Sequence, residues 1–328
     1  MPVKTIIQTV RDTLYEEMLR DESVIILGED VGLAGGVFGA TKGLRAEFGD
    51  MRVMDTPLAE SVIVGAAIGA SLNGMKPIPE IQFADFILPA FDQIVSEAAR
   101  FRYRSNGTWN VPMVVRVPWG GGIHGALYHS QSVEAFFAHV PGLKVVVPSD
   151  PYDAAGLLRS SIDDPDPVIF LEHKRTYRLV KGEVPDGDRF TVPIGKAEVK
   201  RAGTDVSVFA YGLMLYYSLQ AAEALAEQGI NAEVVDIRTL QPLDRDTILA
   251  SVAKTGKALI VYEDNLTGGF GAEIAATIAQ EAFDSLDAPV RRLAGPDVPA
   301  MPYAETLEEV FMPNVERIAA EIRALAEY

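Results

Sequence analysis

The sequence contains no cysteine among its 328 residues. Disulfide bonds, thiolate zinc sites and a cysteine nucleophile are therefore excluded. The first residues lack a basic segment followed by an apolar run and a small-residue cleavage site. No stretch reaches the roughly 18 uninterrupted apolar residues that a membrane span requires. These absences predict a cytoplasmic protein that does not cross a membrane.

Basic residues are scarce as well. The chain has 29 lysines and arginines against 46 aspartates and glutamates, which gives a formal net charge of −17. Nucleic acids and anionic membranes bind proteins of the opposite charge balance, so neither is expected as a partner. Hydrophobic residues, in contrast, make up 48% of the chain, enough for a large core. The length predicts roughly two domains.

Short β-branched runs alternate with helical patterns, which is typical of a mostly parallel sheet covered by helices. The strands expected in the first half are Val24–Leu27, Ile78–Gln82, Pro112–Val117, Lys144–Val147 and Val168–Leu171. The helices expected there are Thr5–Arg20, Pro57–Leu72, Phe86–Arg104, Val133–Ala138 and Tyr152–Ser161. Most of these strands are apolar along their whole length, as in strands buried on both faces.

A charged stretch from Arg175 to Arg201, interrupted by prolines and Gly187, indicates a domain boundary. We predict one domain over residues 1–185, a linker over 186–202 and a second α/β domain over 203–328. The strands expected in the second domain are Val206–Ala210, Ala232–Ile237, Ala258–Tyr262 and Val290–Leu293. Its expected helices are Leu213–Gln228, Arg245–Lys254, Ala272–Ala282 and one after Pro313.

The helix expected after Thr56 carries an acidic residue ahead of an apolar body. Thr56 is suited to capping it and Pro57 to its first position. The body is rich in glycine and alanine, which permits close packing either inside the domain or against another subunit. Glu60 precedes this body, where apolar surroundings would favour a proton donor. A glutamate placed there only by the helix dipole is the alternative.

Three of the four histidines, His124, His129 and His139, fall within sixteen residues after a glycine triplet. No HExxH motif or recurrent carboxylate accompanies them, so a transition-metal site is not favoured. His129 precedes a predicted helix and is the candidate for proton transfer. For His124 and His139 we expect an interior or capping role.

Two glycine-rich segments, residues 28–39 and 267–274, follow predicted strands. Such segments can hold phosphate groups, but neither has the spacing of a known phosphate-binding motif. A tight strand-to-helix turn is the favoured interpretation of both. Phe86, just past a strand, suits either stacking on a flat cofactor ring or packing in the core.

The segments DTPLAESVIVGAAIGASLNG, PIPEIQFADFILPAFDQIVSEAARFRYRS and HGALYHSQSVEAFFAHVPGLKVVVPS follow one another along the chain. Together they resemble the β subunit of the thiamine-diphosphate-dependent 2-oxoacid dehydrogenases. The resemblance covers essentially the whole chain, including GEDVG and VVDIRTLQPLD. It implies a transketolase-like pyrimidine-binding domain with a mostly parallel sheet, followed by a smaller α/β domain of the transketolase C-terminal type.

The resemblance also implies roles for single residues. Glu60 matches the glutamate that activates thiamine diphosphate through a pyrimidine ring nitrogen, and Phe86 matches the aromatic that stacks on that ring. Leu58 and Gln82 fall where the family lines the cofactor and acyl pocket. His129 matches the histidine that serves reductive acylation of a lipoyl group.

The resemblance further implies ions and partners. A structural potassium ion of the family would use oxygens near Ser161, Asp164 and Asp166. The chain lacks the GDG segment, followed by asparagine, with which thiamine enzymes hold magnesium and the diphosphate. An α subunit would therefore share the cofactor and hold the magnesium in an α2β2 heterotetramer. A lipoyl-bearing acyltransferase component would accept the acyl group.

The expected substrate is a 2-oxoacid, with a branched-chain acid preferred. A β subunit acting on pyruvate or acetoin is the alternative within the family. A self-sufficient transketolase-type enzyme is a second alternative, against which the missing GDG segment argues. A noncatalytic α/β scaffold is the third, and it predicts that neither Glu60 nor His129 is needed for activity.

Overall fold

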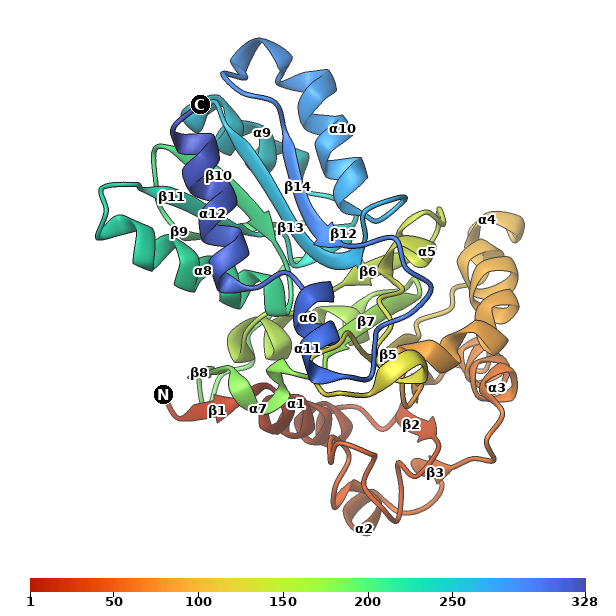
Figure 1. Cartoon of the computed structure of the whole chain (residues 1–328). Coiled ribbons are helices and arrows are strands. Elements are labelled where there is room, and N and C mark those ends of the chain that lie inside the picture. Colours follow the sequence, from red (N-terminus) through yellow and green to blue (C-terminus); the bar gives the residue numbers. More distant parts are fainter. The chain divides into compact units, whose positions relative to one another are not determined.

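A computed structural model describes all residues, Met1–Tyr328. The chain divides into two compact units (Figure 1). The first unit contains Met1–Trp119 and Phe136–Ile194, and the second contains Gly120–Ala135 and Gly195–Tyr328. The histidine-bearing segment Gly120–Ala135 thus groups with the C-terminal half, although in sequence it interrupts the first unit.

The first unit is built on a sheet of six parallel strands in the order β6-β7-β5-β4-β2-β3. A separate antiparallel pair joins β1 to β8. The strands are β1 (Val3–Thr5), β2 (Val24–Gly28), β3 (Val53–Asp55), β4 (Lys76–Glu80), β5 (Val114–Trp119), β6 (Lys144–Val146), β7 (Val168–His173) and β8 (Lys181–Glu183). Every residue of β2, β5 and β7 is buried, as the apolar runs predict.

The helices of this half are α1 (Ile6–Arg20), α2 (Leu44–Phe48), α3 (Glu60–Leu72), α4 (Phe101–Arg104), α5 (Glu134–Ala138), α6 (Pro151–Asp163) and α7 (Thr176–Leu179). A capping box, in which Thr5 and Gln8 exchange hydrogen bonds, fixes the start of α1. Asp150 caps α6, and Pro151 occupies its first turn. Helix α1 packs against α6, and α3 packs against β4.

The second unit contains a five-stranded sheet in the order β14-β13-β10-β11-β9, parallel except for β9. The strands of this sheet are β9 (Glu198–Arg201), β10 (Val206–Ala210), β11 (Ala232–Asp236), β13 (Ala258–Asn265) and β14 (Arg291–Gly295), and the unit also contains the short strand β12 (Thr239–Gln241), which lies outside this sheet. Its helices are α8 (Leu213–Ala226), α9 (Arg245–Thr255), α10 (Gly271–Glu281), α11 (Glu305–Phe311) and α12 (Val315–Ala326). Helix α8 packs against α12, and α9 against α10 (Figure 1).

These sheets confirm the predicted α/β class, and two predicted helices differ in detail. Helix α3 begins at Glu60, with Ala59 as its cap residue, so Thr56 does not cap it. The Thr56 backbone N–H instead bonds the carbonyl of Gly28, and its hydroxyl donates to the carbonyl of Pro57. Thr56 therefore extends the pairing of β3 with β2 rather than starting the helix.

The prediction of one continuous helix over Phe86–Arg104 is wrong, because the helical type changes along the segment. The segment consists of a 3₁₀ stretch Ala84–Ala90, a π turn Gln93–Glu97, a 3₁₀ turn Ala98–Arg100 and then α4. Pro89 lies in the first stretch and has no N–H to donate to a preceding carbonyl. None of the helices of the structure combines the length and the apolar character that a membrane crossing requires.

Candidate active site

Several polar side chains of the first unit follow the carboxyl ends of neighbouring strands. Glu29 and Asp30 come directly after β2, and Gln82 comes shortly after β4. Because β2 and β4 are adjacent and parallel, these ends meet at one edge of the sheet. The Gln82 side-chain amide donates a hydrogen bond to Asp30, with 3.3 Å between Nε2 and Oδ2. This edge is where ligands bind in open α/β sheets.

Glu60 reaches the same edge from the start of α3. It is half-buried and occupies the first turn, where the helix dipole favours a carboxylate. Its negative charge contributes to a raised pKa of Glu29. The two carboxyl groups are therefore close enough to interact, although they lie on different elements.

Glu29 is a functional candidate that the sequence analysis did not select. Burial is the largest cause of its raised pKa, followed by the charges of Glu60 and Asp30. One of its carboxyl oxygens, Oε1, is buried and accepts no hydrogen bond within the chain. A carboxyl group with a raised pKa at the carboxyl edge of a parallel sheet is typical of a functional site. Its place directly after a buried strand was the available signal.

Aromatic rings line up beside this edge. Phe86 lies in the 3₁₀ stretch and is half-buried, and its ring meets the Phe83 ring edge to face at a centroid distance of 6.0 Å. Phe83 in turn contacts Phe38 at 5.5 Å, and the Lys174 ammonium lies 5.6 Å from its centroid. Phe86 is thus part of an aromatic cluster and still partly accessible, and its stacking on a cofactor ring stays a prediction. Leu58 is 78% exposed.

The loop that carries His129 belongs to the second unit and is held by buried carboxylates. Glu263, at the end of β13, accepts a hydrogen bond from the backbone N–H of Gly121. Glu308, on α11, accepts one from Gly122 at 2.8 Å. The same side chain meets His124, with 2.5 Å between Oε2 and Nδ1. His124 therefore ties the loop to α11.

His129 is half-buried and ends a 3₁₀ turn over Ala126–Tyr128. Gly125 permits its placement, because a β-carbon there would lie 2.8 Å from the His129 β-carbon. His139, in contrast, is exposed, so of the two roles expected for it, interior or capping, the interior one is wrong. The fourth histidine, His173, is buried against Trp119 at the end of β7.

The predicted potassium ligands are occupied by other contacts in the structure. Both Asp164 oxygens accept hydrogen bonds from Lys144 at 2.5 and 2.6 Å, and Asp166 accepts one from Arg102 at 2.6 Å. The Ser161 hydroxyl donates to a carbonyl of its own helix. No group of three or more histidine, cysteine, aspartate or glutamate side chains is arranged to hold a metal ion. The potassium site stays a prediction.

Comparison with known families defines the class of the protein. Residues 4–180 match the transketolase pyrimidine-binding domain, and residues 195–318 match the transketolase C-terminal domain. Among solved structures, the chain resembles a split-gene transketolase described as an inactive β4 tetramer. The TM-score is 0.77, the identity is 21%, and the match covers 98% of both chains. This likeness concerns the fold, which is that of the transketolase-type α/β proteins.

Curated relatives narrow this class. The 2-oxoisovalerate dehydrogenase β subunit of Bacillus subtilis is 58% identical over the full length of both chains. The pyruvate dehydrogenase E1 β subunits of Bacillus subtilis and Staphylococcus aureus are 49% and 46% identical, also over the full length of both chains. The chain belongs to the β subunits of the 2-oxoacid dehydrogenases, a family of oxidoreductases, as its motifs predicted.

Proposed function

We propose that this chain is the β subunit of a thiamine-diphosphate-dependent decarboxylating component that oxidises a branched-chain 2-oxoacid and transfers the acyl group to a lipoyl group. The substrate assignment rests on a comparison of this chain with two relatives from one organism. Of two Bacillus subtilis relatives, the 2-oxoisovalerate enzyme subunit is 58% identical and the pyruvate enzyme subunit 49%. A pyruvate or acetoin enzyme is the alternative within the family. The proposed enzyme works in the cytoplasm.

The sheet edge of the first unit fits the pyrimidine half of thiamine diphosphate. It offers the Glu60 carboxyl group, a buried Glu29 oxygen with no donor in the chain, and the accessible Phe86 ring. When bound, the cofactor supplies the carbon nucleophile and the electron sink for decarboxylation. Glu60 holds and moves a proton at a ring nitrogen, and Phe86 stacks on the ring. Gln82 and Leu58 line the cofactor and acyl pocket.

The diphosphate half of the cofactor requires a second chain. Because this chain has no GDG segment, an α subunit holds magnesium and the diphosphate in an α2β2 assembly. One face of α3 carries exposed Val62, Ala66 and Gly69 at helical spacing, and a β-carbon at Gly69 would meet no atom within 4 Å. This small-residue face supports close packing against another subunit.

His129 serves acyl transfer to the lipoyl group of the acyltransferase component, where it orients or protonates the dithiolane. We expect His129→Ala to lower acyl transfer to a lipoyl domain more than decarboxylation measured with an artificial electron acceptor. The exposed His139→Ala is the matched control and should change neither rate. Equal losses in both assays would remove this role.

The substrate is tested by coexpression with the α subunit and measurement of kcat/KM for 2-oxoisovalerate and pyruvate. A higher value for 2-oxoisovalerate is expected, and a higher value for pyruvate would reassign the enzyme. Shared cofactor binding is tested by titrating the isolated chain with thiamine diphosphate and magnesium. Tight magnesium-dependent binding by this chain alone would favour the self-sufficient enzyme instead.

Glu60→Gln distinguishes an enzyme from a scaffold. With its proton-transfer group removed, the reconstituted complex should lose about 100-fold or more in kcat. Glu47→Gln, an exposed glutamate on α2, is the control and should keep full activity. An unchanged rate in Glu60→Gln, with the complex intact, would favour the noncatalytic scaffold.

A further inference from the structure

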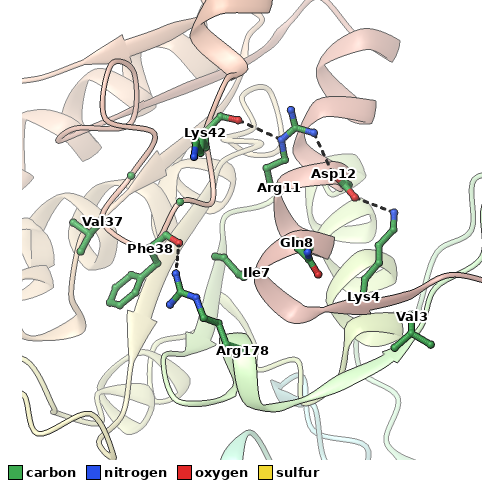
Figure 2. Close-up of a pocket in the computed structure, with 12 residues that line it drawn as sticks. Val3, Lys4, Ile7, Gln8, Arg11, Asp12, Val37, Phe38, Lys42 and Arg178 are labelled. Atoms are coloured by element: carbon green, nitrogen blue, oxygen red, sulfur yellow. Dashed lines mark hydrogen bonds and ion pairs between the residues drawn. The ribbon is translucent and has the colours of Figure 1, made fainter.

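A pocket of about 830 Å³ lies in the first unit, between the start of α1, residues 36–42 of the glycine-rich loop and α7 (Figure 2). Its lining includes none of the residues assigned above to the cofactor or to acyl transfer. The volume lies within the range of small-molecule sites, which is about 300–1,000 Å³. The pocket is therefore a separate cavity of ligand size.

Four of the five charged side chains in this lining are cationic. Lys4, Arg11, Lys42 and Arg178 face a single carboxylate, that of Asp12. The chain as a whole has a formal net charge of −17, whereas this pocket has four cationic side chains and one acidic one. Such a concentration of positive charge attracts anions locally, whatever the net charge of the molecule.

Only part of this positive charge is neutralised within the chain. Asp12 pairs with Lys4 at 2.9 Å and with Arg11 at 3.1 Å. Lys42 and Arg178 are exposed, and neither has a carboxylate partner. Arg178 donates one hydrogen bond, to the carbonyl of Phe38 at 3.4 Å, and its other N–H groups remain available. Two cationic groups are thus free to bind a ligand.

The glycine-rich loop is fastened in place beside these cations. Arg11 donates from Nε to the carbonyl of Lys42 at 3.3 Å, and Arg178 holds Phe38 from the opposite side. Gly36 and Gly39 have φ values of +79° and +88°, which are unfavourable for other residues. A β-carbon at Gly39 would meet no atom within 4 Å, so a ligand can approach the backbone there. The tight turn predicted for this segment therefore also forms a pocket wall.

Apolar groups complete the lining. Ile7 lies near the centre of the pocket, with Arg11, Lys4 and Arg178 around it (Figure 2). Val37 adds apolar surface from the loop, whereas the Phe38 ring points away from Ile7 and packs against Phe83 and Tyr177 (Figure 2). The ligand therefore needs a group of several negative charges and a carbon part that contacts Ile7 and Val37.

We propose that this pocket binds a small organic polyphosphate of the nucleoside di- or triphosphate class. Lys42 and Arg178 bind the phosphate oxygens, since arginine and lysine are the usual partners of phosphate. Val37 and Ile7 contact the nucleoside. The proposal does not depend on the catalytic role of the chain.

The test is calorimetric titration of the isolated full-length chain with ADP, inorganic pyrophosphate and adenosine as probes. ADP should bind most tightly, pyrophosphate more weakly and adenosine least. Raising KCl from about 50 to about 300 mM should weaken ADP binding, because the cations are exposed. Absence of ADP binding at millimolar concentration, or equal binding of adenosine, would overturn the proposal.

Substitutions in the pocket lining test whether ADP binds at this pocket. The double variant Lys42→Glu, Arg178→Glu should weaken ADP binding by about tenfold or more. Both side chains are exposed, so the fold should be preserved, and a thermal melt checks this. Lys181→Glu, an exposed cation outside the pocket, should leave binding unchanged. Val37→Ser should weaken ADP but not pyrophosphate. ADP binding to the folded double variant at wild-type affinity would place the site elsewhere.

Discussion

Two groups of buried carboxyl side chains, one in each unit, are accommodated in opposite ways. In the first unit, Arg116 on β5 lies between Glu80 on β4 and Glu172 on β7, and all three are buried. The arginine meets Glu80 at 2.5 Å and Glu172 at 2.6 and 2.8 Å. The Tyr177 hydroxyl donates a further hydrogen bond to Glu172. Each charge thus has an opposite charge or a hydrogen-bond donor.

In the second unit, carboxyl groups gather with one another. Burial and the charge of Asp264 raise the pKa of Glu134 well above its usual value. Burial, together with the charge of Glu263, raises the pKa of Asp264 to about 6. Glu134 accepts a hydrogen bond from Tyr211 at 3.0 Å, but its Oε2 has no partner.

The difference indicates a structural role for the group around Arg116 and a titratable group around Asp264. A buried arginine between two carboxylates links three adjacent strands through paired opposite charges. Among the buried acids, the pKa of Asp264 is raised to about 6 and that of Glu134 is raised as well, and perturbed pKa values of this kind are typical of functional sites. The acid group adjoins the loop that carries His129, because Glu263 also binds Gly121.

The largest effect on stability is expected at Arg116, which is paired with Glu80 and Glu172. Arg116→Met removes the only cation between two buried carboxylates, so unfolding free energy should fall by about 3–5 kcal/mol. Urea denaturation measures the loss. Adding Glu80→Gln and Glu172→Gln should recover part of the stability, because the uncompensated charges disappear. A loss below about 1 kcal/mol in the single variant would show that the triad is not structural.

In the second unit, replacing a buried carboxyl group should raise stability instead of lowering it. The pKa of folded Asp264 is about 6, above its ordinary value of 3.8, so folding takes up a proton between these values and stability rises as pH falls toward about 4. Above pH about 7 the buried charge costs stability. Asp264→Asn should therefore stabilise the protein at pH about 8 by on the order of 1–3 kcal/mol and have little effect near pH about 4.

Urea denaturation of both proteins across this pH range measures the difference. Asparagine can still accept the hydrogen bond from the backbone N–H of Asn265 that Asp264 accepts at 2.8 Å. Asp284→Asn, at an exposed position, is the control and should leave the pH profile unchanged. An unchanged profile in Asp264→Asn would mean that this carboxyl group titrates normally.

The sequence predicted the sheet-forming strands because they are buried β-branched runs, as in Val24–Gly28 and Val206–Ala210. It predicted Glu60 and Phe86 through their motif and not through periodicity. The changing pitch between Ala84 and Arg104 was not predictable, because apolar spacing does not distinguish 3₁₀, α and π turns. Short strands such as β3 and β12 are set by tertiary pairing and leave little local signal.

The hydrogen bonds that hold the His129 loop could not be predicted from the local sequence either. Glu263 and Glu308 lie 142 and 186 residues from their partners Gly121 and Gly122. No spacing rule links residues so distant, and glutamates are usually exposed, so nothing marked these two as buried. The sequence therefore predicted the residue on the loop but not the contacts that hold the loop.

A smaller and local effect is expected where the loop meets α11. Glu308→Gln keeps an acceptor for the Gly122 N–H but loses the charge that meets His124, so local opening should become easier by about 1–2 kcal/mol. Hydrogen exchange at Gly122 measures this. Glu309→Gln, the exposed neighbour, is the matched control. Unchanged exchange in Glu308→Gln would show that charge on Glu308 does not hold the loop.

The smallest effect is expected at an exposed pair, which isolates burial as the cause of the contrast. Arg104 meets Glu97 at 2.6 Å, close to the spacing in the Arg116 triad, but their side chains are 46% and 43% exposed. Water screens the attraction, and ordering two long side chains costs entropy. Arg104→Met should therefore change unfolding free energy by less than about 1 kcal/mol, in the same urea experiment as Arg116→Met. A loss equal to that of Arg116→Met would mean that ion pairing, and not burial, governs the stability of both sites.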